Sequence, residues 1–178
     1  FPYTTLFRSL FIMALLLVPI AQAQDNAAFE PADCPFDVPD SQTVDCGYLS
    51  VPEDRGDPNS PQIALAVAIV RASSGNALPD PIVYLEGGPG GSALLAVDAW
   101  YDTAYGVDRD IILIDQRGTG YSEPVLVCDE ETDLDEVAAT VECREQLEAQ
   151  GINLSAYTSA TNAADIEALR VALGYNQI

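Results

Sequence analysis

A glycine-rich segment is the part of this sequence whose residue types and spacing are best suited to chemistry. It reads YLEGGPGGS over residues 84–92, with four glycines and one proline between Gly87 and Gly91, directly after an apolar run. Such a loop can form a tight turn, cradle a phosphate, or direct backbone N–H groups at the oxyanion that develops during acyl transfer. Other parts of the sequence discriminate among these three interpretations.

Both phosphate-binding interpretations are weak. A Walker-type loop needs a lysine, and the chain contains none. Gly88, Gly90 and Ala93 match the dinucleotide-binding pattern G-x-G-x-x-G/A, but Pro89 removes a backbone donor from within it. A plain turn explains one or two of the glycines and not the others. The oxyanion interpretation is favoured, because backbone without Cβ atoms can place N–H donors about 3 Å from a developing charge.

The hydrophobic pattern around the loop predicts a mixed sheet. Residues 46–54 and 62–72 are strand-like and flank the turn segment RGDPNSP, which predicts an antiparallel hairpin. Residues 81–86 and 111–115 are short apolar strands on either side of a predicted helix over residues 92–106. Strand, glycine loop, helix and strand form a βαβ unit, which requires parallel strands.

Two further helices are predicted after this unit. An acidic helix covers residues 134–151, and an amphipathic helix ends at residue 173. We expect the second helix to be capped near Thr161 or Asn162, with Asp165 in its first turn. Ser92 is expected to cap the helix of the βαβ unit, and Ser122 to be a loop serine.

Composition limits the classes of partner. The chain has 28 acidic and seven basic residues, for a net charge of −21, and such a surface repels nucleic acid and anionic membranes. An apolar content of 48% indicates a globular protein and not a disordered acidic tail. There is no histidine and no C-x-x-C motif, so we expect no metal and no cofactor.

The amino-terminal region predicts export. Residues 1–9 match the translation of a DNA sequencing adapter and are interpreted as an artefact. Residues 10–23 combine a short apolar run with a small-x-small motif, which predicts a signal peptide cleaved after Ala23 and a secreted or periplasmic protein. A proline-rich lead without regular structure is expected over residues 24–45, followed by one partial domain over residues 46–178.

Four cysteines in an exported chain predict disulfides. Three pairings are possible for four cysteines. We favour the two local pairs, Cys34–Cys46 and Cys128–Cys143, and free buried thiols are the alternative.

Three segments in order support a family resemblance. The segments that carry this resemblance are EGGPGGS, DQRGTGYSEP and SAYTSATNAADIEALRVALG. The chain resembles secreted α/β-hydrolases of the proline iminopeptidase and tripeptidyl aminopeptidase type over roughly residues 34–178. The resemblance implies the amino-terminal part of an α/β-hydrolase fold. An antiparallel hairpin would lead into a parallel sheet with helices on both faces, and the chain would end before the nucleophile strand.

The resemblance also assigns roles to residues. It implies that the backbone N–H of Gly88 belongs to the oxyanion hole and that the Gly88–Pro89 bond can be cis. Glu86 stands where many members have histidine, and its role stays open. The remaining oxyanion-loop residues are Gly87, Pro89, Gly90 and Gly91. The D-Q-R-G motif corresponds to Asp115, Gln116, Arg117 and Gly118, with Arg117 bracing neighbouring loops and a solvated arginine as the alternative.

No catalytic triad is present in this chain. The family's serine lies in a G-x-S-x-G motif on the strand after the last predicted helix, and its acid and histidine follow later. Without histidine the chain has no general base for a serine nucleophile. We therefore expect part of an exported serine hydrolase, an aminopeptidase acting on peptides, with the fragment itself inactive. An esterase of the same fold, acting on a small ester, and an exported non-catalytic binding module are the alternatives.

Overall fold

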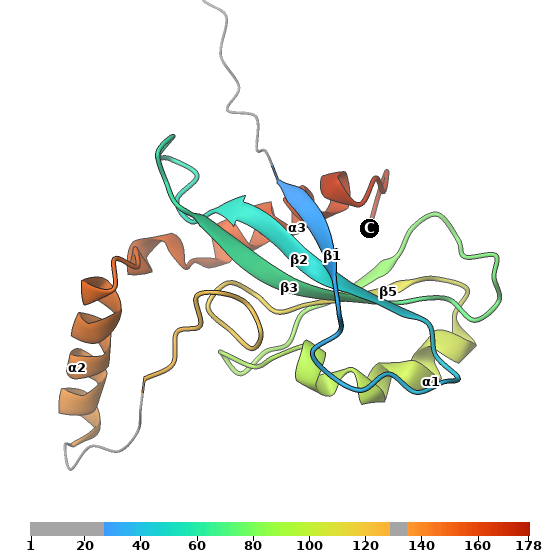
Figure 1. Cartoon of the computed structure of the whole chain (residues 1–178), viewed down its shortest axis with the longest axis horizontal. Helices are drawn as coiled ribbons and strands as arrows, with labels where there is room; N and C mark the ends of the chain where they lie inside the picture. The colour runs from blue at the N-terminus through green and yellow to red at the C-terminus, as the bar shows by residue number, and fades with distance from the viewer. Residues whose placement is uncertain (1–26, 129–134) are drawn as a thin grey trace, which may run out of the picture.

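The computed structural model describes residues 27–128 and 135–178 (Figure 1). The predicted adapter artefact and signal peptide lie outside the described residues. Within these ranges, no helix is both long enough and apolar enough to span a membrane.

The described strands form one mixed sheet in the order β1-β2-β3-β5-β4. The hairpin pair β2 and β3 is antiparallel, as predicted, and β4 pairs with β5 in the predicted parallel arrangement. Strand β3 also pairs with β5 in antiparallel register, so the hairpin is joined directly to the βαβ unit. The strand bounds are β1 Ala28–Ala32, β2 Val44–Pro52, β3 Gln62–Val70, β4 Ile82–Tyr84 and β5 Ile111–Ile114.

Helices lie on both faces of this sheet, which confirms the prediction. The side chains of β3 and β5 alternate between two apolar clusters, because successive residues of a strand point to opposite faces. One cluster includes Leu94, Val97 and Tyr101, from the helix of the βαβ unit and the turn before it. The other includes Ala168 and Leu169 of the last helix.

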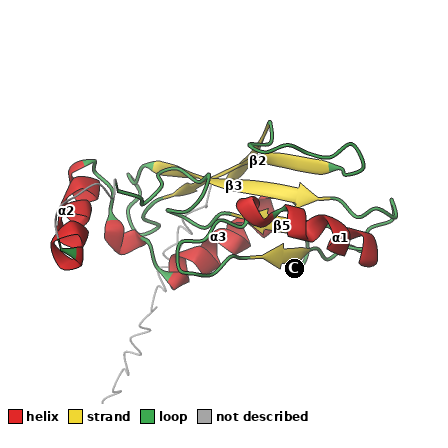
Figure 2. Cartoon of the chain, turned by 90° about the horizontal axis from the view of Figure 1, so that it is seen from below, coloured by secondary structure: helices red, strands yellow, loops and turns green. Residues whose placement is uncertain are grey.

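The helical elements are η1 Leu94–Ala96, α1 Asp98–Gly106, α2 Glu136–Ala149, η2 Leu154–Ala156 and α3 Ser159–Ala172. Helix α2 lies apart from the sheet in both views (Figures 1 and 2). The described side chains of this helix are mostly exposed, and Leu147 is its buried residue. The apolar faces of α1 and α3 are therefore the ones that cover the sheet.

Three expectations about local structure were wrong. The lead contains strand β1, which forms because its backbone pairs with β2 from Ala28 to Ala32. Helix α1 begins at Asp98 and not at residue 92, because a separate 3-10 turn, Leu94–Ala96, comes first. Ser92 does not cap α1; its Oγ accepts from the Leu95 N–H of this turn. The cap of α3 is Thr158, three residues before Thr161, and the two threonines form a reciprocal capping box, so Asp165 lies in the second turn of the helix and not in the first.

The structure contains both favoured disulfides. Cys34 is bonded to Cys46, so the segment after β1 is fixed to β2. Cys128 is bonded to Cys143, which joins the segment following the D-Q-R-G motif to helix α2. Both bonds close short local loops, which lowers the conformational entropy of the unfolded chain.

Candidate active site

The glycine loop, residues 86–91, follows β4 and has a backbone that requires glycine. Gly88 and Gly90 have φ values of 129° and 91°, in a region that side chains with a Cβ atom rarely adopt. The Gly91 N–H donates to the Gly87 carbonyl at 3.0 Å and closes the loop. The Gly88–Pro89 peptide bond is cis. These features account for more of the glycines than a plain turn does.

Two donors of the loop are available to a ligand. Within the described parts of the chain, the N–H groups of Gly88 and Gly90 have no hydrogen-bond acceptor, and both residues are exposed. Backbone donors of this kind normally find a partner in protein or water. The loop therefore presents N–H groups to the solvent at the carboxyl end of a parallel strand.

Glu86 is tied to the loop by its side chain and its backbone. Its carboxylate accepts from the Tyr84 hydroxyl at 2.6 Å and from the Gly87 N–H at 2.9 Å. These two bonds, the one from Tyr84 first, hold the pKa of the Glu86 carboxyl below its ordinary value. The Glu86 carbonyl accepts from the Gln116 side chain at 2.9 Å. Gln116, the second residue of the D-Q-R-G motif, therefore supports the loop directly.

Asp115 fixes the segment that leaves the loop. Its carboxylate is fully buried and accepts from the Ser92 hydroxyl at 2.9 Å and from the Leu94 N–H at 3.1 Å. It also accepts from the Tyr121 N–H at 2.8 Å. A Cβ atom on Gly120 would lie 2.0 Å from the Asp115 Oδ2, so the second glycine of the RGTG sequence permits this approach.

The two serines near Asp115 have structural partners. The Ser122 hydroxyl is buried, donates to the Asp115 carbonyl at 2.7 Å, and accepts from the Ala66 N–H at 3.0 Å. Ser92 donates to the Asp115 carboxylate and accepts from the Leu95 N–H. The carboxylate that pairs with Ser92 is fully buried and also accepts from two backbone N–H groups, and neither serine has a histidine as a partner, so neither is arranged as a nucleophile.

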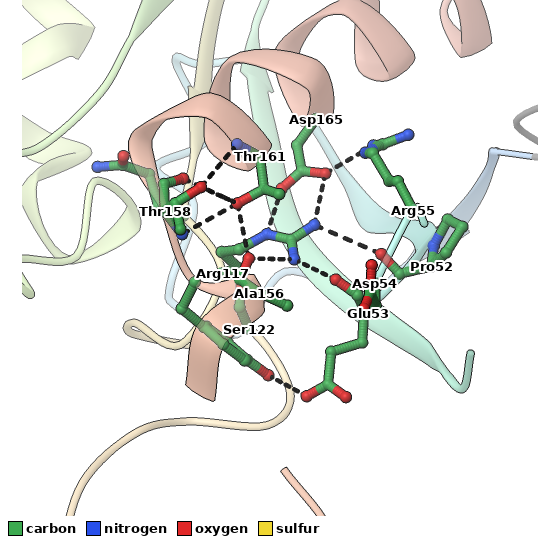
Figure 3. A network of polar contacts seen from close by, with 12 residues as sticks. Pro52, Glu53, Asp54, Arg55, Arg117, Ser122, Ala156, Thr158, Thr161 and Asp165 are labelled. Carbon is green, nitrogen blue, oxygen red and sulfur yellow. Dashed lines mark hydrogen bonds and ion pairs between the residues drawn. The ribbon is translucent and has the colours of Figure 1, made fainter. Parts of the chain in front are cut away.

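Arg117 is buried and not solvated. Its side chain is 0% exposed and forms a two-pronged ion pair with Asp165, with both N···O distances at 2.8 Å (Figure 3). Its Nη1 donates to the carbonyls of Glu53 at 2.6 Å and Ala156 at 3.0 Å. Arg55 bonds to the same Asp165 carboxylate at 2.7 Å. We call Arg55, Arg117 and Asp165 the arginine cluster.

The arginine cluster joins three parts of the chain. Arg117 follows β5, Asp165 lies in α3, and the Glu53 carbonyl follows β2. The Glu53 side chain is also buried and accepts from the Tyr157 hydroxyl at 2.9 Å. The D-Q-R-G motif therefore supports the glycine loop through Gln116 and holds α3 through Arg117.

Sequence reasoning brought some of these residues together and missed others. It expected Arg117 to brace neighbouring loops but did not identify Asp165, Glu53 or Tyr157 as partners of the region. An acidic residue on the apolar side of a predicted amphipathic helix was the available signal for Asp165. Gly118, the last residue of the motif, has a φ of 82° and packs against Leu126. The described residues contain no acidic, histidine or cysteine cluster that could hold a metal ion.

Comparisons with known proteins agree with this geometry. The profile of the alpha/beta hydrolase fold family matches residues 80–178, and the chain belongs to that family. It is similar to the tripeptidyl aminopeptidases of Streptomyces lividans and Streptomyces coelicolor, with 28% identity over 86% of this chain in each case. The chain spans about a third of the length of these relatives, at 33% and 32%.

Proposed function

We propose that this chain is the amino-terminal part of an exported serine hydrolase that acts as an aminopeptidase. The observation that carries the proposal is the exposed glycine loop, in which the Gly88 N–H has no acceptor among the described residues. A donor fixed in this way is suited to a tetrahedral oxyanion. Similarity to tripeptidyl aminopeptidases supports peptides with a free amino terminus as the substrate class.

In this proposal the chain contributes half of an oxyanion hole. A serine encoded beyond residue 178 attacks the scissile carbonyl and forms an acyl-enzyme, while the Gly88 N–H donates to the oxyanion. The second donor is the N–H of the residue after the serine. Loss of one such donor lowers kcat by about 10²- to 10³-fold. The chain has no histidine to serve as general base, so residues 1–178 alone are expected to be inactive.

Sequencing the source DNA beyond the codon for Ile178 is the first test. A strand followed by G-x-S-x-G, and then by a later aspartate and histidine, supports the proposal. A continuation without the serine contradicts it and favours a non-catalytic module.

The substrate class is tested on the longer protein. We expect it to hydrolyse a tripeptide p-nitroanilide with a free amino terminus, and to leave the N-acetylated analogue intact. The variant with alanine in place of the G-x-S-x-G serine is the control. Hydrolysis of p-nitrophenyl acetate without any peptide hydrolysis would instead indicate an esterase.

Export is tested separately by the amino terminus of the mature protein. The two disulfides are typical of proteins from oxidising compartments. We expect the protein recovered outside the cytoplasm to begin at Gln24. Recovery of the uncleaved chain from the cytoplasm would contradict this part of the proposal.

A further inference from the structure

The side chain of Glu86 occupies the inside of the glycine loop. A Cβ atom on Gly91 would lie 2.5 Å from the Glu86 Cγ and 2.6 Å from the Gly87 carbonyl oxygen. The methylene groups of Glu86 therefore take the space that a side chain at position 91 would need. Gly91 is glycine because the loop closes over this glutamate.

The carboxylate of Glu86 meets two donors, one on each oxygen. Oε2 accepts from the Tyr84 hydroxyl and Oε1 from the Gly87 N–H. A carboxylate suits this arrangement because both of its oxygens accept, whereas a glutamine has only one oxygen. Within the described residues, Tyr84 is the one titratable side chain that bonds to the Glu86 carboxylate. Gln116, which follows β5, is neutral and bonds to the Glu86 backbone carbonyl instead.

The link continues from Glu86 into helix α1. The Tyr84 ring packs against the Trp100 ring, with centroids 4.4 Å apart and planes tilted by 49°. Both aromatic residues are partly buried against the apolar cluster that contains Tyr101 and Leu94. The loop is thus linked to helix α1 through the Glu86 carboxylate and the Tyr84–Trp100 contact, in addition to its attachment through Gln116.

We propose that Glu86 is a positioning residue whose carboxylate, held between the Tyr84 hydroxyl and the Gly87 N–H, fixes the glycine loop with the Gly88 N–H facing outward. The bond to the Gly87 N–H holds the Glu86–Gly87 peptide unit, which directly precedes the Gly87–Gly88 unit that carries the Gly88 N–H. The catalytic use of the Gly88 N–H rests on the proposed function. The ordering of the loop by Glu86 does not depend on the proposed function.

Hydrogen–deuterium exchange of the intact protein tests the ordering directly. We expect Glu86→Ala to raise the exchange rate of peptides covering residues 84–92 about tenfold, because the loop loses both bonds to the Glu86 carboxylate. Glu86→Gln should give a smaller rise, since the glutamine retains one acceptor. Tyr84→Phe should give a rise similar to that of Glu86→Gln, because each removes one bond.

Glu123→Gln is the matched control. It makes the same chemical change at an exposed glutamate whose side chain has no hydrogen bond among the described residues. It should leave both the exchange of residues 84–92 and the activity unchanged. Circular dichroism and thermal melts of each variant separate loss of loop order from loss of the fold.

Kinetics distinguish a positioning role from a purely structural one. We expect Glu86→Ala to lower kcat of the longer enzyme about tenfold or more with little change in KM, and Glu86→Gln to recover part of the loss. Unchanged exchange in Glu86→Ala would overturn the inference. Faster exchange with unchanged kcat would overturn the catalytic part of it. If the unsubstituted enzyme hydrolyses nothing, the proposed function fails, while the exchange rates still decide the role of Glu86 in the loop.

Discussion

In the glycine loop, the N–H groups of Gly88 and Gly90 have no acceptor among the described residues, whereas every guanidinium nitrogen of Arg117 has one. The difference follows from burial. Gly88 and Gly90 are exposed, so water can pair with their donors, while the Arg117 side chain is 0% exposed and must find partners within the protein. The loop therefore has backbone donors left unpaired within the described residues, and the arginine cluster holds together the segments around it.

Removal of Arg117 should produce the largest effect on stability. Arg117→Met leaves the buried Asp165 carboxylate with Arg55 as its remaining ion-pair partner, and we expect the free energy of unfolding to fall by about 3–5 kcal/mol. Arg144→Met is the control, because Arg144 forms an exposed ion pair with Glu148 and its loss should change stability far less. Urea unfolding measures both. A similar loss in the two variants would show that the burial of the cluster does not matter.

A methyl group at Gly91 should disturb the loop and leave the arginine cluster intact. Gly91→Ala places a Cβ atom within 2.6 Å of both the Glu86 Cγ and the Gly87 carbonyl oxygen, and we expect a loss of about 1–3 kcal/mol. Gly87→Ala is the matched control, since a Cβ atom there meets nothing within 4 Å. Its stability should change by less than about 0.5 kcal/mol. Thermal and urea unfolding should rank the variants in this order; equal losses would contradict the packing of Glu86 inside the loop.

Asp110 is less deeply buried than Arg117 but less exposed than the glycine loop. Its substitution should have the smallest effect on stability of the three. Burial alone would raise the pKa of its carboxyl, but bonds from the Ala72 N–H, Arg71 and Tyr175 outweigh it, so the pKa lies below the ordinary value. A lowered folded-state pKa stabilises the protein above the unfolded-state pKa of about 3.9, and this stabilisation is lost as the pH falls further.

The measurement for Asp110 is urea unfolding as a function of pH. We expect Asp110→Asn to be less stable than the unsubstituted protein by about 1 kcal/mol at neutral pH, with the difference shrinking below about pH 4. Asp108→Asn is the control at an exposed neighbour and should show no such difference. A difference that stays constant down to pH 2 would mean that the charge of Asp110 is not responsible.

Much of the fold was predictable because its strands are apolar along their length. Residues of β3 and β5 are buried on both faces, and their sequences indicate strands without any tertiary information. Strand β1 was not predictable in this way. Four of its five residues are exposed and Pro31 lies within it, so it is identified by its pairing with β2 and not by its own pattern.

The candidate site was predictable where backbone freedom or a motif marked it. The glycines of the loop and the D-Q-R-G motif were visible in the sequence, and the similarity to hydrolases supports their grouping. The partners of Arg117 were not, because Asp165 lies 48 residues further along the chain. The bond from Gln116 to the Glu86 carbonyl was equally hidden, since a backbone acceptor leaves no trace in the sequence.

A force applied to the chain before Ala28 would peel β1 away from β2 one residue pair at a time, ending at the pair of Ala32 and Cys46. At Cys34 the load would pass through the disulfide directly to β2, and residues 35–45 would carry no tension. Under oxidising conditions, only β1 and the two residues after it can therefore extend before the force reaches the β2–β3 hairpin. Reduction would add the slack of the whole connecting segment.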